Sequence, residues 1–166
     1  MTTGSNGGPP GRPARPSTVA ELLLAGNDLG HLLERMVRRQ ADLSLVQFNA
    51  LRVVKGREPA PAQASDLTRT LHVSSAHATT LLQQLELRGL IERAESGADR
   101  RRRPVRLTEG GESALASAMP ALLDLEERLA TSLGEPQVSA LWSDLRNVRL
   151  AVREALATDD LDCVGP

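Results

Sequence analysis

The side chains best suited to chemistry in this sequence are hydrogen-bonding groups on one predicted helix and a run of arginines that follows it. Short polar side chains on an exposed helix face are the kind that read base edges in the major groove of DNA. Arginines suit phosphates and a narrow minor groove, because the guanidinium group stays charged and presents a planar fork of donors. The candidate DNA-binding residues are Ser74, Ser75, His77, Thr80, Gln83, Gln84, Asp99, Arg100, Arg101, Arg102 and Arg103.

Both features also have a plainer interpretation. A polar helix face is ordinarily solvated surface, and a run of charges is usually a solvated loop. The arginines favour DNA because they follow a helix-turn-helix pattern directly. Asp99 cannot attract phosphate, so its expected role is to hold the loop or a neighbouring arginine in position.

The helix that carries the polar face has clear ends in the sequence. Ser74 is placed to cap its start, and Gly89 is placed to end it in a left-handed conformation. Apolar residues recur at three-four spacing on the opposite face, which predicts that this face is buried. They are Ala78, Leu81, Leu82 and Leu85.

The neighbouring segments place this helix in a recognisable order. A short helix is predicted near 63–71, just before it. Extended runs at 90–93 and 104–107 follow it and flank a turn-rich loop. The order of helix, turn, helix and two-stranded ribbon predicts a mainly α fold, a winged helix-turn-helix with a three-helix core and a two-stranded β wing.

The N-terminal part is predicted to be an arm followed by a helix. Residues 1–16 are rich in Gly and Pro, so we expect a disordered arm. A helix follows within 17–42. The next helix begins at Ser44, where Ser44 and Gln47 have the spacing of a capping box.

The C-terminal part is predicted to hold two helices, with Thr108 capping the first and the second running from Pro136 to about Thr158. Apolar residues of the second repeat at spacings of three and four, which is a seam for another helix. The terminal helices lie outside the winged-helix core in sequence, so we expect them to join two chains. The seam residues are Val138, Leu141, Leu145, Val148 and Val152. The expected organisation is therefore an arm (1–16), a dimerisation helix (17–42), a DNA-binding lobe (43–108), dimerisation helices (109–158) and an acidic tail (159–166).

Composition narrows the class of protein. The single Cys163 excludes an internal disulfide framework, and the N-terminus does not read as a signal peptide, so we expect a cytoplasmic protein without a membrane span. One Phe, one Trp and no Tyr leave few side chains for stacking on single-stranded bases. We find no catalytic motif, and the three histidines are too scattered to predict a metal site, so we expect neither an enzyme nor a cofactor.

Charge is segregated along the chain although the net charge is only −1. Residues 1–108 hold 16 basic and 10 acidic residues, whereas 109–166 hold 4 basic and 11 acidic residues. A basic half attracts phosphate and an acidic half repels it, so the segregation orients the molecule on DNA. The plainer interpretation is that the acidic half only keeps the protein in solution.

The central segment resembles the MarR-type transcriptional regulators. The stretch 43–54, LSLVQFNALRVV, looks like the family's helix before its DNA-binding motif, and 65–93 looks like its helix-turn-helix. DRRRRPVRLTEGG at 99–111 resembles its wing. The resemblance implies a homodimer that binds a pseudo-palindromic operator in double-stranded DNA. One residue departs from the pattern, because Thr80 stands where the family often has a basic residue.

The resemblance also implies a repressor that a small molecule releases from its operator. The sequence does not identify the effector or the residues that bind it. Phe48, Leu51 and the Leu29 to Leu33 face could line such a cavity, or they could be ordinary core residues. The alternative function is an architectural or partner-binding winged-helix protein without a ligand switch.

Overall fold

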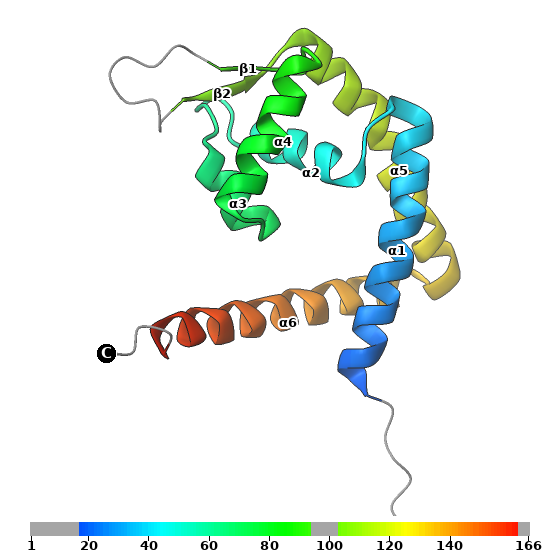
Figure 1. Ribbon diagram of the computed structural model, residues 1–166. Helices are drawn as coiled ribbons and strands as arrows, with labels where there is room; N and C mark the ends of the chain where they lie inside the picture. The colour runs from blue at the N-terminus through cyan, green and yellow to red at the C-terminus, as the bar shows by residue number, and fades with distance from the viewer. Residues whose placement is uncertain (1–16, 94–102, 163–166) are drawn as a thin grey trace, which may run out of the picture.

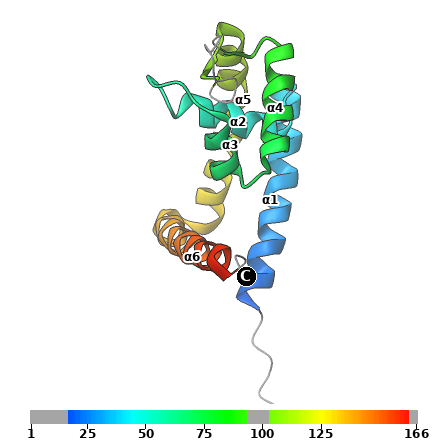
Figure 2. The same ribbon diagram turned by 60° about the vertical axis from the view of Figure 1, so that its left-hand side comes forward.

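The computed structural model describes residues 17–93 and 103–162, with side chains up to residue 156. Three helices and a small sheet form a lobe, two long helices run side by side next to it, and a last helix projects as an arm (Figure 1). Figure 2 shows the arm nearly end-on, below the lobe. The elements are α1 (Thr18–Ala41), α2 (Leu45–Lys55), α3 (Ala64–Leu71), α4 (Ser75–Leu87), β1 (Ile91–Arg93), β2 (Val105–Leu107), α5 (Glu109–Leu133) and α6 (Glu135–Asp162).

Four helices begin at a side-chain cap that the sequence shows directly. Ser17 and Ser74 each accept a hydrogen bond from the backbone N–H three residues further on, at 3.3 Å and 3.2 Å. Thr108 does the same for α5 at 3.0 Å. At α2 the predicted capping box is confirmed, since Gln47 N–H donates to Ser44 Oγ and Ser44 N–H donates to Gln47 Oε1. Each cap satisfies a backbone donor that the helix leaves free.

Two glycines shape the passage from α4 into the sheet and α5. Gly89 has φ +66°, so the predicted left-handed end of α4 is confirmed. Gly111 lies in the first turn of α5 directly against Leu90, where a Cβ would be 1.9 Å from the Leu90 carbonyl oxygen. Thr108 completes the contact, because its hydroxyl donates to the Gly89 carbonyl at 2.6 Å. The end of α4 and the start of α5 are therefore in close backbone contact.

The hydrophobic core lies within the lobe and extends toward α1 and α5. The predicted apolar face of α4 is buried, as Ala78, Leu81, Leu82 and Leu85 all belong to the core. Phe48 and Leu51 of α2 are fully buried there too, so they are core residues and do not line an open cavity. The core is completed by Val37 from α1 and by small residues of α5.

The sheet has two antiparallel strands, with Ile91 opposite Leu107 and Arg93 opposite Val105. The loop between α2 and α3 adds a single bridge. Ala62 exchanges both backbone hydrogen bonds with Val105, at 2.9 Å and 2.8 Å. The base of the wing is thereby fixed to the helix-turn-helix.

The last helix is longer than the sequence predicted. We expected it to end near Thr158, but α6 continues to Asp162. The physical reason is that no Gly or Pro interrupts the chain between Pro136 and Gly165, and acidic residues alone do not end a helix. Its predicted apolar seam is exposed, with Leu145 43% accessible. None of the helices in residues 17–93 and 103–162 is long and apolar enough to cross a membrane.

Candidate nucleic-acid interface

The polar face of α4 lies open to solvent. Every predicted base-reading residue on it is exposed, and Ser74 at its start accepts the capping hydrogen bond from His77 N–H. The exposed residues are Ser75, His77, Thr80, Gln83 and Gln84. Of the predicted wing residues, Arg103 is described and exposed, whereas Asp99, Arg100, Arg101 and Arg102 lie outside the described residues.

Two threonines on α4 use their hydroxyl hydrogens within the helix. Thr79 donates to the Ser75 carbonyl at 2.8 Å, and Thr80 donates to the Ala76 carbonyl at 3.1 Å. The hydroxyl oxygens keep a lone pair and the methyl groups stay outside. Each threonine can therefore accept a hydrogen bond or contact a thymine methyl, but it has no free donor in this conformation.

A hollow of about 770 Å³ lies between α3, α4 and the sheet. We call it the arginine hollow, because Arg69 of α3, Arg93 of β1 and Arg103 before β2 all line it. Hydroxyl groups surround these cations. They belong to Ser65, Thr68, Ser75 and Thr79. Guanidinium and hydroxyl donors around one concave surface are the groups that bind the phosphates of a DNA backbone.

Arg93 is the most enclosed cation of the arginine hollow. Its side chain is only 12% exposed, and its Nε lies 3.3 Å from a Glu86 carboxylate oxygen. That contact has no hydrogen-bond geometry, and Nε and Nη2 find no hydrogen-bond partner within the described part of the chain. The burial of these two donors is costly, and an anion in the hollow would offset part of that cost through its charge, because the donors themselves are not accessible to it.

Arg69 is held at the edge of the hollow by a buried carboxylate. Asp66 is only 4% exposed and accepts a hydrogen bond from Arg69 at 2.6 Å. It also accepts from the Gln63 N–H at 2.8 Å and lies 3.5 Å from Arg57. The carboxylate caps α3 and fixes the direction of two arginines, which removes part of the entropic cost of ordering them on a ligand.

Lys55 joins the lobe to α5 on another side. Its ammonium group lies 2.7 Å from Glu112 and 2.8 Å from Glu58. The hydrogen bond to Glu112, and after it the one to Glu58, raise the pKa of Lys55. Lys55 in turn lowers the pKa of Glu58. The three groups hold the end of α2 beside the start of α5.

The sequence alone did not identify five polar residues of the arginine hollow. They are Ser65, Thr68, Arg69, Thr79 and Arg93. Thr79 had a usable signal, because it lies four residues after Ser75 and therefore on the same side of α4. Arg93 had a weaker one, since it lies two residues after the buried Ile91 and therefore on the same face of the strand. The structure brings Ser75 and Arg103 into the hollow, whereas Thr80, Gln83 and Gln84 do not line it.

The order of α2, α3, α4 and a two-stranded antiparallel wing defines a winged helix-turn-helix protein. Comparison with known families identifies the winged-helix proteins that this chain resembles. The family model described as the MarR family matches residues 41–102, which is the lobe and the start of the wing. This segment of the chain is similar to the MarR family.

Individual relatives agree with this assignment. The transcriptional repressor MprA of Escherichia coli strain K12 is 40% identical over 73 residues, which cover 44% of this chain and 42% of MprA. The match thus spans less than half the length of this relative. Among solved structures, the repressor CouR bound to a 23-mer DNA duplex is 26% identical with a TM-score of 0.72, covering 80% of this chain and 92% of CouR.

A more distant solved structure shares the fold. The MepR–DNA complex of S. aureus is 18% identical with a TM-score of 0.72, and the likeness covers 81% of this chain and 98% of MepR. At this identity the likeness concerns the fold alone. It includes the long flanking helices as well as the lobe, because four-fifths of the chain is covered.

Proposed function

We propose that this protein is a sequence-specific transcription regulator that binds double-stranded DNA, and that it acts as a repressor. One observation carries the proposal: an exposed polar face on α4 adjoins a hollow lined by three arginines, in a chain whose residues 41–102 match the MarR family. The polar face reads base edges, and the hollow and the wing bind phosphates. The relatives named MprA and CouR are repressors, which supports the same sign of regulation.

The proposed regulator is a homodimer. Large apolar side chains along α1 and α6 are exposed in the single chain, including Leu23 at 65% and Trp142 at 63%. A second copy that packs on these faces removes them from water, which is the main driving force for association. Two lobes related by a twofold axis read two half-sites about one helical turn apart, so the operator is a pseudo-palindrome.

We also propose that a small molecule modulates operator affinity. A hollow of about 260 Å³ between α1 and α5 is a candidate site, since it combines the apolar Leu32 and Met36 with Arg35, Arg39 and Arg128. Asp124 also lines this hollow and pairs with Arg128 at 3.0 Å, so the excess of positive charge comes from Arg35 and Arg39 and favours an anionic ligand. A ligand held between these helices would favour one separation of the two lobes, and affinity falls when that separation no longer matches the groove repeat. We expect such a regulator to work in the cytoplasm and to need no cofactor.

The experiment is a selection followed by a titration with the full chain. Duplexes enriched from a random pool are sequenced, and the enriched duplex is compared with a scrambled one at fixed salt concentration. We expect two related half-sites and a preference of at least about 10³-fold, the lower end for specific binders. Equal affinity for both duplexes would overturn the proposal.

The alternative function is an architectural or partner-binding winged helix without a ligand switch. The same selection distinguishes them in part, because an architectural protein enriches flexible sequences rather than two half-sites. A panel of aromatic carboxylates added to the operator complex completes the test. Loss of binding with any of them supports the switch.

A further inference from the structure

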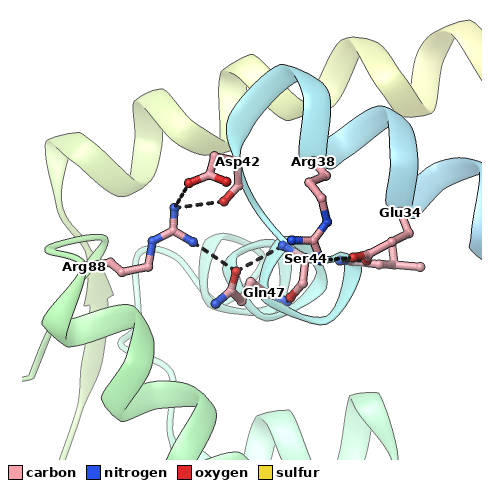
Figure 3. Close-up of polar contacts among 7 residues, drawn as sticks. Glu34, Arg38, Asp42, Ser44, Gln47 and Arg88 are labelled. Carbon is pink, nitrogen blue, oxygen red and sulfur yellow. Dashed lines mark hydrogen bonds and ion pairs between the residues drawn. The ribbon is translucent and has the colours of Figure 1, made fainter.

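The end of α4 is tied to the corner between α1 and α2 by one side chain, Arg88. Its Nη2 donates to the Asp42 carbonyl oxygen at 2.9 Å and lies 3.3 Å from the Asp42 carboxylate. Its Nη1 donates to Gln47 Oε1 at 3.1 Å. Figure 3 shows the guanidinium group between these two residues, and we call this arrangement the Arg88 bridge. It links residues that are more than 40 positions apart in the sequence.

The corner that receives Arg88 is itself held by hydrogen bonds. Asp42 has φ +51° and ends α1 in a left-handed conformation. Gln47 Oε1 accepts from Ser44 N–H at 3.0 Å as well as from Arg88. Glu34 of α1 accepts from the Leu45 N–H at the start of α2. Figure 3 shows the contacts of Arg88, Asp42, Gln47 and Ser44 beside those of Glu34 and Arg38.

The bridge matters because it leads from α4 to α1, whereas the contacts of Glu86 with Arg93 and of Gly89 with Thr108 lead to the sheet and to the start of α5. The buried face of α4 packs through aliphatic side chains, and apolar contacts resist separation better than they resist a small rotation. Arg88 caps the C-terminal end of the helix, and its own N–H bonds to the Gln84 carbonyl at 3.1 Å. A charged, forked donor at this point fixes the helix direction relative to α1.

We propose that Arg88 is a positioning residue that fixes α4 relative to α1 and thereby sets the half-site spacing that the dimer accepts. The inference rests on the proposed function, in which α1 helps to join two subunits. Each lobe then carries its α4 at a fixed angle from the dimer axis. Loosening the bridge lets each α4 tilt, so that operators with altered spacing are tolerated better.

A direct attraction of Arg88 for DNA phosphate makes a different prediction. Arg88 lies at the opposite end of α4 from Ser74 and Ser75, and its guanidinium is already engaged by the corner. Removing the Asp42 carboxylate separates the two ideas. If Arg88 attracts phosphate, its release should tighten binding to every duplex. If it positions α4, its release should change the spacing preference.

The test uses the full chain and three duplexes: the enriched operator and versions with one base pair added or removed between half-sites. The readout is the ratio of affinities for the original and altered spacings. We expect Arg88→Met to lower this ratio by about threefold to tenfold, the scale of one ordinary hydrogen bond. Asp42→Gly should lower it in the same direction and by less, because glycine keeps the left-handed corner and the carbonyl acceptor remains.

The control is Arg52→Met, which removes the same charge from an exposed residue of α2 whose guanidinium lies 5.6 Å from the Phe48 ring centroid. It should leave the spacing ratio unchanged. The inference would be overturned if a folded Arg88→Met variant kept the parent's ratio of affinities for the original and altered spacings. It would also be overturned if Asp42→Gly bound all three duplexes more tightly by the same factor. A parent protein without any spacing preference would instead overturn the proposed dimeric reading of two half-sites. Circular dichroism establishes that each variant is folded.

Discussion

Replacing Gly111 by alanine should destabilise the protein through a contact that can be measured on the structure. The new Cβ would lie 1.9 Å from the Leu90 carbonyl oxygen, and an ordinary C···O contact is about 3.3 Å. The first turn of α5 or the end of α4 must therefore move by roughly 1.4 Å. The moving carbonyl is the acceptor for Thr108 N–H at 3.2 Å, so this hydrogen bond is weakened too.

The magnitude follows from three contributions. Overpacking costs about 1–3 kcal/mol, and a weakened hydrogen bond costs about 1 kcal/mol. Alanine regains about 1 kcal/mol of helix propensity over glycine. The net loss is about 1–3 kcal/mol, which lowers Tm by roughly 2–12 °C for a chain of this size.

Thermal unfolding followed by circular dichroism at one protein concentration measures this loss. Gly26→Ala is the matched control, since it also replaces a helical glycine, and nothing lies within 4 Å of the added Cβ. It should raise Tm by about 2–4 °C through propensity alone. The reasoning is refuted if both variants shift Tm in the same direction, because the close approach of α5 to Leu90 would then carry no cost.

Four further outcomes are expected. Thr80→Ala and Gln84→Ala should weaken operator binding by about 1–3 kcal/mol each while leaving binding to random duplex nearly unchanged, and equal losses in competition titrations would mean that this face does not read bases. Arg101→Ala, at a position outside the described residues, should reduce the log-log salt slope by up to about 2 for a dimer, and an unchanged slope in titrations at several salt concentrations would contradict a role in phosphate binding. Leu145→Asp should give a single-chain mass in light scattering at micromolar concentration, because a charge buried in the interface without a partner costs several kcal/mol. A dimer that persists in this variant would mean that the interface lies elsewhere. Glu34→Gln should make the free energy of unfolding fall less steeply in acid. The Leu45 N–H, with Arg38 assisting, lowers the pKa of Glu34 below 4.5, so the stabilisation by its carboxylate is present above that value and is lost as pH falls through the folded-state pKa. Identical acid unfolding curves of parent and variant would exclude this role of Glu34.

The parts of the fold that sequence predicted well depend on local signals. The capping box at Ser44 and the left-handed end at Gly89 are encoded within a few residues, so no knowledge of the tertiary structure is needed. The buried face of α4 follows from its spacing in the same way. The length of α6 was underestimated, because the prediction treated acidic residues after Thr158 as an end although no helix breaker is present.

The parts that sequence missed depend on contacts between distant segments. The arginine hollow needs α3, α4 and the sheet in their final positions before Arg69 and Arg93 share one surface. The Arg88 bridge joins segments that no periodicity relates. The sequence shows that Gly111 lies in the first turn of a helix, but it does not indicate that the Leu90 carbonyl packs against it.

The exposed apolar face of α6 has a consequence for the life of a newly made chain. Leu141, Leu145 and Val148 are each at least 40% accessible before any partner arrives. Contiguous apolar surface of this kind attracts chaperones and promotes aggregation. If a second copy covers it, resistance to heat and to proteases rises with protein concentration, because pairing draws the folding equilibrium by mass action. A cell that makes few copies would then clear unpaired chains quickly, and the level of the regulator would depend more steeply than linearly on its rate of synthesis.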